Sequence, residues 1–334
     1  MRAPHSPCVH RPGASFEGKR YAPEDLAKLV GPAAATRVFT LTDPAHACCR
    51  IIEERALKGA AEWAAANRRR AAGPVTSARV DGRTLTTDSQ MADGPGQLDG
   101  PAFGPAEEGK GGEALLDCFT RGKDVVTRWK GLAGAGLGLA ASFGLASGVL
   151  EFRASGLEGV GGNRAVEMEV VTPGLNRLLI GIDDTDTPQS GATWALAREA
   201  TAGLEDMAVL SLRVVQLFPG VPTKTTNCVA TLVEGAVAPW MKEAVKIEVR
   251  DRIESLAKST EVGLAFAEGV VIDRFAEAEA FCRRARKEIV TEADAQAAAR
   301  AFGAQVVLDG RGMIGAVAAL GAAEMGPEAA DLPR

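Results

Sequence analysis

The chain has 334 residues, of which 46% are hydrophobic and 24% are charged, and its formal net charge at pH 7 is −5. These values are typical of a globular protein with room for two or three domains. The net acidity argues against broad, non-specific nucleic-acid binding, although a local basic groove stays open. The six cysteines are scattered and contain no Cys-x-x-Cys pair. We therefore predict neither a structural zinc site nor a disulfide framework, and we expect a cytoplasmic location.

The first half of the chain mixes patterned and unpatterned segments. Residues 1–35 are rich in Pro, Arg and Ala and predict a loosely ordered extension. We predict an N-terminal α/β domain over residues 36–173, with a flexible Gly/Pro-rich insertion at about 72–114. Residues 131–150 carry no charge and are long enough to span a bilayer. Because they are mostly glycine and alanine, a tightly packed buried helix is favoured, and no membrane partner is expected.

After Pro173, strand and helix patterns alternate regularly, and we assign residues 174–330 to one nucleotide-binding-like region. We predict strands at 178–182, 208–217, 228–233 and 305–308, and helices at about 191–205, 237–258, 274–288 and 292–302. This order predicts an α/β or α+β fold in which helices pack against mixed β-sheets.

The most informative segment is residues 178–187, Leu-Leu-Ile-Gly-Ile-Asp-Asp-Thr-Asp-Thr. Its apolar run predicts a buried strand, and Asp183, Asp184 and Asp186 fall where that strand should end. Because clustered carboxylates repel one another, a hard cation such as Mg²⁺ would suit them. A solvated turn that caps the following helix is an equally open interpretation of these ten residues.

A second segment, residues 217–228, predicts a rigid turn between two strands. Two prolines and a glycine restrict its backbone, and Lys224 stands among threonines and Asn227. An ammonium group surrounded by hydroxyl and amide donors suits phosphate oxygens. The alternative is a solvated hairpin whose polar side chains only satisfy the backbone of the turn.

A third segment, Gly310-Arg311-Gly312, precedes the last predicted helix. Glycines allow a backbone to approach a ligand closely, and a helix N-terminus favours anions. Taken alone this signal is weak, because glycine turns before helices are common.

These motifs occur in a recognisable order: Ile-Asp-Asp-Thr-Asp, then Pro-x-x-Pro-x-Lys-Thr-x-Asn, then Arg-Gly-Met-Ile-Gly-Ala-Val. Together they resemble the archaeal agmatidine synthetase family, which modifies a tRNA anticodon cytidine with agmatine. The chain is more closely similar to the related methanogenesis marker protein 11 family. The likeness covers roughly residues 36–66 and 120–325, and a set of motifs this long is more specific than any one of them.

The resemblance implies a kinase-like Asp-Asp-Thr-Asp domain followed by a ferredoxin-like part, with ATP and Mg²⁺ as cofactors. It implies that Asp183, Asp184 and Asp186 hold Mg²⁺ and that Asp183, Asp184 and Lys224 are catalytic. The residues that it implies for nucleotide binding are Thr185, Thr187, Thr193, Thr225, Asn227, Gly310, Arg311 and Gly312.

From this likeness we expect a methanogenesis-marker-11-like, ATP- and Mg²⁺-dependent enzyme of the phosphoryl-transfer type. Its acceptor is expected to be a small molecule or a protein. One alternative is a non-catalytic nucleotide-binding or assembly factor, and another is an RNA-modification enzyme without its own RNA-recruiting domains. The synthetase carries a nucleic-acid-binding module and a zinc ribbon, whereas the cysteines of this chain cannot form such a ribbon. We therefore expect a nucleic-acid partner to be absent, and the sequence does not predict the oligomeric state.

Overall fold

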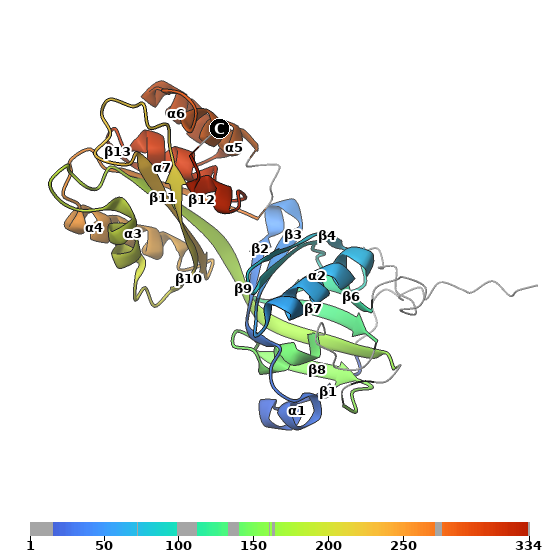
Figure 1. Cartoon of the computed structure of the whole chain (residues 1–334). Helices are drawn as coiled ribbons and strands as arrows, with labels where there is room; N and C mark the ends of the chain where they lie inside the picture. Colours follow the sequence, from blue (N-terminus) through green and yellow to red (C-terminus); the bar gives the residue numbers. More distant parts are fainter. Residues whose placement is uncertain are drawn as a thin grey trace, which may run out of the picture. The chain divides into compact units, whose positions relative to one another are not determined.

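The chain divides into two compact units, Met1–Leu175 and Asn176–Arg334, which are described separately (Figure 1). The computed structural model describes residues 16–71, 73–98, 112–132, 140–159, 161, 164–270 and 276–332. One long strand, β9 (Val166–Asp183), contributes its first half to the N-terminal unit and its second half to the C-terminal unit.

The N-terminal unit is built mainly from antiparallel strands. Its elements are β1 (Lys19–Arg20), α1 (Pro23–Val30), β2 (Ala35–Asp43), β3 (Cys48–Arg55), α2 (Lys58–Ala71), β4 (Val75–Asp81), β5 (Thr84–Gln90), β6 (Glu113–Arg121), β7 (Asp124–Gly131), β8 (Glu151–Ser155) and the start of β9. Strands β6-β7-β9-β8-β1 pair antiparallel in that order. Strand β2 pairs parallel with β9 at Gly174 and Leu175 and continues into the antiparallel order β2-β3-β5-β4.

A cluster of four fully buried charged side chains lies inside this unit: Glu53, Arg55, Arg68 and Glu113. Arg68 donates hydrogen bonds to both glutamates, and its guanidinium group lies 4.7 Å from the centre of the Trp129 ring. Burial raises the pKa of Glu113 to about 7, although the neighbouring arginines act in the opposite direction. Because each charge is paired, removal of one partner would leave another charge buried without compensation.

The C-terminal unit is a five-stranded antiparallel sheet covered by helices. Its elements after β9 are α3 (Thr193–Thr201), β10 (Met207–Gln216), β11 (Val229–Val237), α4 (Lys242–Leu256), β12 (Gly263–Glu268), α5 (Ala276–Ala285), α6 (Glu292–Phe302), β13 (Gln305–Asp309) and α7 (Met313–Leu320). The strand order is β10-β11-β9-β12-β13. With sheets and helices in both units, the predicted mixed α+β class is confirmed.

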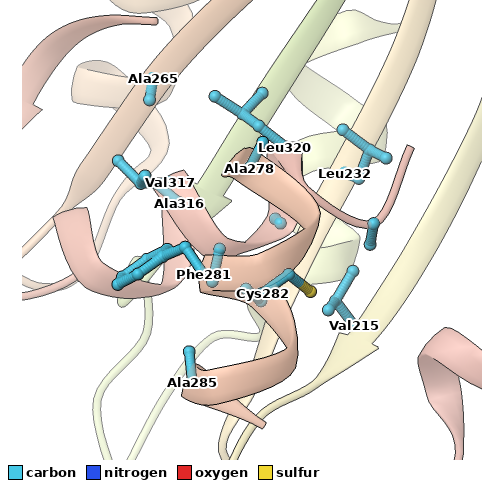
Figure 2. Close-up of a cluster of buried hydrophobic side chains, with 14 of the residues drawn as sticks. Val215, Leu232, Ala265, Ala278, Phe281, Cys282, Ala285, Ala316, Val317 and Leu320 are labelled. Atoms are coloured by element: carbon cyan, nitrogen blue, oxygen red, sulfur yellow. The ribbon is translucent and has the colours of Figure 1, made fainter. Parts of the chain in front are cut away.

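Both faces of this sheet are buried, which explains the continuous apolar run before the acidic cluster. Leu178, Ile180 and Ile182 pack in one core with α3 and α4, whereas Leu179 belongs to the core under α5, α6 and α7. Figure 2 shows the second core, in which Phe281 of α5 and the side chains of α7 lie over the strands. Successive side chains of a strand point to opposite faces, so a strand covered on both faces must be apolar throughout.

Helix α7 approaches the strands so closely that glycine is required at the contacts. A Cβ atom on Gly181 of β9 would lie 2.0 Å from the carbonyl oxygen of Ala316, and one on Gly263 of β12 would lie 1.9 Å from the carbonyl carbon of Gly312. This contact places the start of α7 beside the end of β9. The acidic cluster (Asp183, Asp184 and Asp186, also called the acidic strand end) and the glycine loop (residues 310–312) are therefore neighbours because of backbone packing.

The structure corrects four details of the predicted elements. Residues 1–35 contain α1, because Pro23 starts the helix and Leu26 is buried. The range 72–114 contains strands β4 and β5, which a turn with Gly82 in the left-handed region connects. Strand β12 was not predicted, and β9 continues through Pro173 instead of ending there.

The uncharged segment 131–150 is only partly covered, since residues 133–139 lie outside the described residues. Its later part contains a short 3₁₀ helix, Ala140–Leu145, where a longer helix had been predicted. None of the helices in the described ranges is both long and apolar enough to cross a membrane.

Candidate functional site

A cavity of about 600 Å³ lies within the C-terminal unit, and all three predicted segments contribute to its wall. Of the predicted site residues, the structure brings together Asp183, Asp184, Asp186, Thr187, Thr193, Lys224, Thr225, Asn227 and Arg311 around this cavity. It does not place Thr185, Gly310 or Gly312 in the cavity wall. The wall therefore combines carboxylates, hydroxyl groups and two cationic side chains.

Asp183 is the last residue of β9, and its carboxylate is held tightly. Its Oδ1 accepts a hydrogen bond of 2.8 Å from the backbone N–H of Asp184. Its Oδ2 lies against Gly315 of α7, where an added Cβ would be only 1.7 Å away. Burial raises the pKa of Asp183 well above its usual value, and the charges of Asp184 and Asp186 add to this effect. A cation bound beside Asp183 would relieve this unfavourable burial of negative charge.

Asp184 links the acidic strand end to the glycine loop. Its backbone lies in the left-handed region, with φ of 51°, which is uncommon for a residue other than glycine. Arg311 Nε donates a hydrogen bond of 3.0 Å to Asp184 Oδ2. Burial raises the pKa of Asp184, while the Arg311 guanidinium acts to lower it. The strained backbone of Asp184 thus directs its carboxylate to a cationic partner.

Gly310 and Gly312 allow the loop to pack against neighbouring backbone. An added Cβ on Gly310 would lie 2.5 Å from the carbonyl carbon of Glu261, and one on Gly312 would lie 2.7 Å from the carbonyl oxygen of Asp183. The two glycines therefore position Arg311 without lining the cavity themselves.

Asp186 connects the acidic strand end to the turn of residues 217–228, called the lysine turn below, through two threonines. Thr193 Oγ1 donates a hydrogen bond of 3.4 Å to Asp186 Oδ1, and Thr225 Oγ1 lies 3.4 Å from both carboxylate oxygens of Asp186. Thr185 lies behind this group, where its Oγ1 donates a hydrogen bond of 3.2 Å to Thr193 Oγ1. Thr185 is therefore a buried support for Thr193 and not a wall residue.

The lysine turn is closed by its own hydrogen bonds. Lys224 Nζ donates a hydrogen bond of 2.6 Å to the carbonyl oxygen of Pro219, and Gln216 Nε2 donates to the carbonyl oxygens of Leu217 and Asn227. An ammonium group has three donors, so Lys224 can keep this bond and also contact an anion. The turn therefore presents an exposed cation on the cavity wall.

Several wall residues were not predicted from the sequence. Gly315 stands next to Asp183, Cys228 has a φ of 54°, and Ile289 comes from the connection between α5 and α6. Trp194 follows Thr193 directly and lies half exposed in the wall. The motif Gly-Ala-Thr-Trp could have indicated Trp194, whereas no polar or periodic signal marks Ile289.

No group of three or more His, Cys, Asp or Glu side chains within the described ranges is arranged to hold a metal ion. Asp184 is paired with Arg311, so Asp183 and Asp186 are the carboxylates best suited to a cation. Mg²⁺ usually uses one or two protein carboxylates and completes its shell with water and phosphate oxygens. Asp183 and Asp186 match this coordination of Mg²⁺ only if phosphate groups are also bound.

Comparison with known proteins gives matches to a family model, to related proteins and to solved structures. Residues 179–308 match the family model of the TiaS TCKD domain. The uncharacterized protein MJ0921 of Methanocaldococcus jannaschii is 32% identical over 292 residues, which cover 86% of this chain and 93% of that protein. TiaS of Pyrobaculum neutrophilum, a tRNA 2-agmatinylcytidine synthetase, is 34% identical over 157 residues.

The match to TiaS covers 44% of this chain and 35% of that enzyme, so this chain spans about a third of its length. Among solved structures, the complex of TiaS with its tRNA and ATP is 26% identical with a TM-score of 0.41, over 45% of this chain and 37% of that one. Apo TiaS is 24% identical with a TM-score of 0.39. The expectation that nucleic acid is not a partner gains no support from these relatives.

Proposed function

Because the chain belongs to the TiaS-related family that includes the uncharacterized protein MJ0921, we propose that it is an ATP-dependent enzyme of the phosphoryl-transfer type. The observation that carries this proposal is the single cavity in which the acidic strand end, Lys224 and Arg311 meet. The match of residues 179–308 to the TiaS TCKD domain adds support, because it spans the acidic strand end and the lysine turn. The narrower assignment to methanogenesis marker protein 11 rests on the motif likeness alone and is part of this proposal.

In this proposal the triphosphate lies between the acidic strand end and the lysine turn. Lys224 and Arg311 oppose the negative charge of the phosphates, and Asp183 and Asp186 hold Mg²⁺. When bound, Mg²⁺ neutralises charge on the phosphate oxygens and fixes their orientation. Positioning and charge neutralisation provide most of the catalysis in phosphoryl transfer, so no strong nucleophile is required from the wall.

The hydroxyl and amide groups of the wall orient the phosphates in this scheme. Thr193 and Thr225 keep Asp186 in place through their hydrogen bonds, and Asn227 contributes to the same cavity wall as Lys224. The proposed nucleotide contacts are Thr187, Thr193, Thr225, Asn227 and Arg311, with Thr185, Gly310 and Gly312 as supports behind them.

The test is calorimetric titration of the full chain with Mg·ATP, together with an assay of phosphate release. Asp183→Asn should abolish Mg²⁺-dependent ATP binding or turnover, and Lys224→Ala should weaken ATP binding. Asp251→Asn and Lys58→Ala are matched controls, because both residues are exposed and lie outside the cavity wall. Unchanged ATP affinity and turnover in Asp183→Asn would refute the proposal.

Two other outcomes point to the alternatives. Mg·ATP binding without turnover, even in the presence of candidate acceptors, would favour a non-catalytic nucleotide-binding or assembly factor. The relation to TiaS favours RNA modification as the second candidate function, since that relative is by name a tRNA-modifying synthetase. It predicts tRNA binding that weakens steeply as the salt concentration rises.

A further inference from the structure

Two large apolar side chains are exposed in the wall of the cavity. The exposed fraction is 48% for Trp194 and 61% for Ile289, and both residues contribute to the same wall as the carboxylates and Lys224. Isolated exposed apolar residues need no explanation on an open surface. Within a cavity, however, apolar and aromatic walls with a few polar groups are typical of a ligand site. These two side chains have no role in the phosphate contacts described above.

We propose that Trp194 stacks on the base of the bound nucleotide and that Ile289 adds apolar contact to that base. This inference rests on the proposed function, because it assigns the part of the cavity that does not contact phosphate. It identifies the ligand as a nucleoside triphosphate held at its base as well as at its phosphates. The base is recognised by its flat face, which every base presents, and not by hydrogen bonds to its edge.

The position of Trp194 in the chain supports this assignment. It is the second residue of α3 and follows Thr193, whose Oγ1 lies 3.4 Å from Asp186 Oδ1. The indole is therefore anchored one residue away from the group that contacts the acidic strand end. Helix α3 is held by the buried side chains of Leu196 and Ala197, so the anchor is part of a packed element.

The size of the cavity also favours a whole nucleotide. At about 600 Å³, it lies within the range of roughly 300–1,000 Å³ that holds a drug-sized ligand. An inorganic triphosphate would use the charged wall and leave the apolar side chains in water. A nucleoside triphosphate has a group for each kind of side chain, and so it explains why one cavity is lined by both charged and exposed apolar side chains.

The test compares Mg·ATP with Mg·tripolyphosphate, which has the phosphates but no base. Calorimetric titrations use the full chain as wild type, Trp194→Ala and Trp194→Phe, with Trp240→Ala as a matched control. Trp240 is an exposed tryptophan of the same unit that is outside the cavity wall. Loss of base stacking should weaken Mg·ATP binding by roughly 5- to 150-fold in Trp194→Ala. Mg·tripolyphosphate binding should change by less than about 2-fold, and Trp194→Phe should restore most of the ATP affinity.

The outcomes separate this inference from the proposed function. Wild-type protein that binds neither probe would overturn both. Wild-type protein that binds both probes with equal affinity would overturn the base contact alone. The same conclusion would follow if Trp194→Ala kept wild-type ATP affinity, or if it lost both probes equally. Because stacking tolerates any base, Mg·GTP should show a loss in Trp194→Ala similar to that of Mg·ATP, and a loss confined to one base would also contradict the inference.

Discussion

Replacing Gly315 with alanine should displace the Asp183 carboxylate in the cavity wall and lower ATP turnover, while the fold stays intact. The added methyl group would lie 1.7 Å from Oδ2 and 2.6 Å from Cγ of Asp183. Non-bonded carbon atoms in favourable contact are about 3.5 Å apart. The Asp183 carboxylate must therefore withdraw by more than about 1.5 Å. Since a misplacement of about 1 Å can cost about 100-fold in rate, ATP turnover should fall by about that factor or more.

The expected change in stability is small because two effects oppose each other. Alanine is favoured over glycine inside a helix by about 1 kcal/mol. Overpacking against Asp183 costs about 1–3 kcal/mol. The net loss in free energy of unfolding should therefore lie between about 0 and 2 kcal/mol, and the variant should remain folded at 25 °C.

The assays are calorimetric Mg·ATP binding, phosphate release and thermal unfolding of the same preparation. Gly59→Ala is the matched control, because Gly59 also lies in the first turn of a helix and an added Cβ there would meet nothing within 4 Å. It should raise stability by up to about 1 kcal/mol and leave ATP binding unchanged. A folded Gly315→Ala variant with wild-type ATP binding and turnover would refute the role assigned to the Asp183 carboxylate.

Three further predictions concern the fold. Phe281→Ala should lower the free energy of unfolding by about 3–5 kcal/mol, because Phe281 fills the core under α5 and α7 (Figure 2). Chemical denaturation measures this loss, and a loss below about 1 kcal/mol would contradict the prediction. Burial raises the pKa of Glu113 from 4.5 to about 7, so the folded state keeps a proton on Glu113 at pH values where the unfolded state has lost it. The contribution of Glu113 to stability therefore falls as the pH rises from about 4.5 to about 7. Glu113→Gln should remove up to about 3 kcal/mol of that pH dependence in denaturation curves between pH 4.5 and 8, whereas an unchanged slope would mean that another group is responsible. Thr291→Ala should lower the stability of the protein by about 1 kcal/mol, as measured by thermal unfolding, because the Thr291 side chain and Asp294 form a reciprocal cap at the start of α6. A Thr291→Ser variant keeps the hydroxyl group, so an equal loss of stability in that variant would argue against the cap.

The sequence predicts the elements of the C-terminal unit well where local signals mark both ends of a helix. The predicted helix at 292–302 coincides with α6, because Thr291 and Asp294 mark its start and Gly303 its end. Strand β12 was missed because Gly263-Leu-Ala-Phe-Ala-Glu contains two alanines and a glycine, none of which favours a strand. Its conformation comes from pairing with β9 and from contact with α7, which local propensity does not contain.

Pro173 shows the opposite error. Proline usually ends a strand because it lacks an N–H donor, so the sequence predicted a boundary there. In the structure, Pro173 is paired with Asp124 at the start of β7, where the pairing of β9 with β7 ends, and Gly174 N donates to the carbonyl oxygen of Lys123 instead. The strand therefore continues across the proline as its neighbours change.

For the candidate site, the charged residues could be predicted and their supports could not. Asp183, Lys224 and Arg311 belong to residue types that identify their own chemistry, and their segments do line one cavity. Gly315 became meaningful only through its contact with Asp183, which depends on the packing of α7 against β9. Ile289 is an apolar residue in a connecting segment, and only the fold places it in the cavity wall.

The continuity of β9 has a consequence for how the length of this chain can vary in evolution. Because the side chains of β9 in the C-terminal unit alternate between two buried faces, an insertion or deletion inside residues 179–182 must keep the parity of the strand. Deleting one residue from 179–182 would turn the strand residues that follow it to the opposite face and would move the Asp183 carboxylate to the face away from Gly315. Changes of two residues would keep the faces but shift the acidic end along its neighbours. Length variation among family members should therefore accumulate in loops and be rare within this strand.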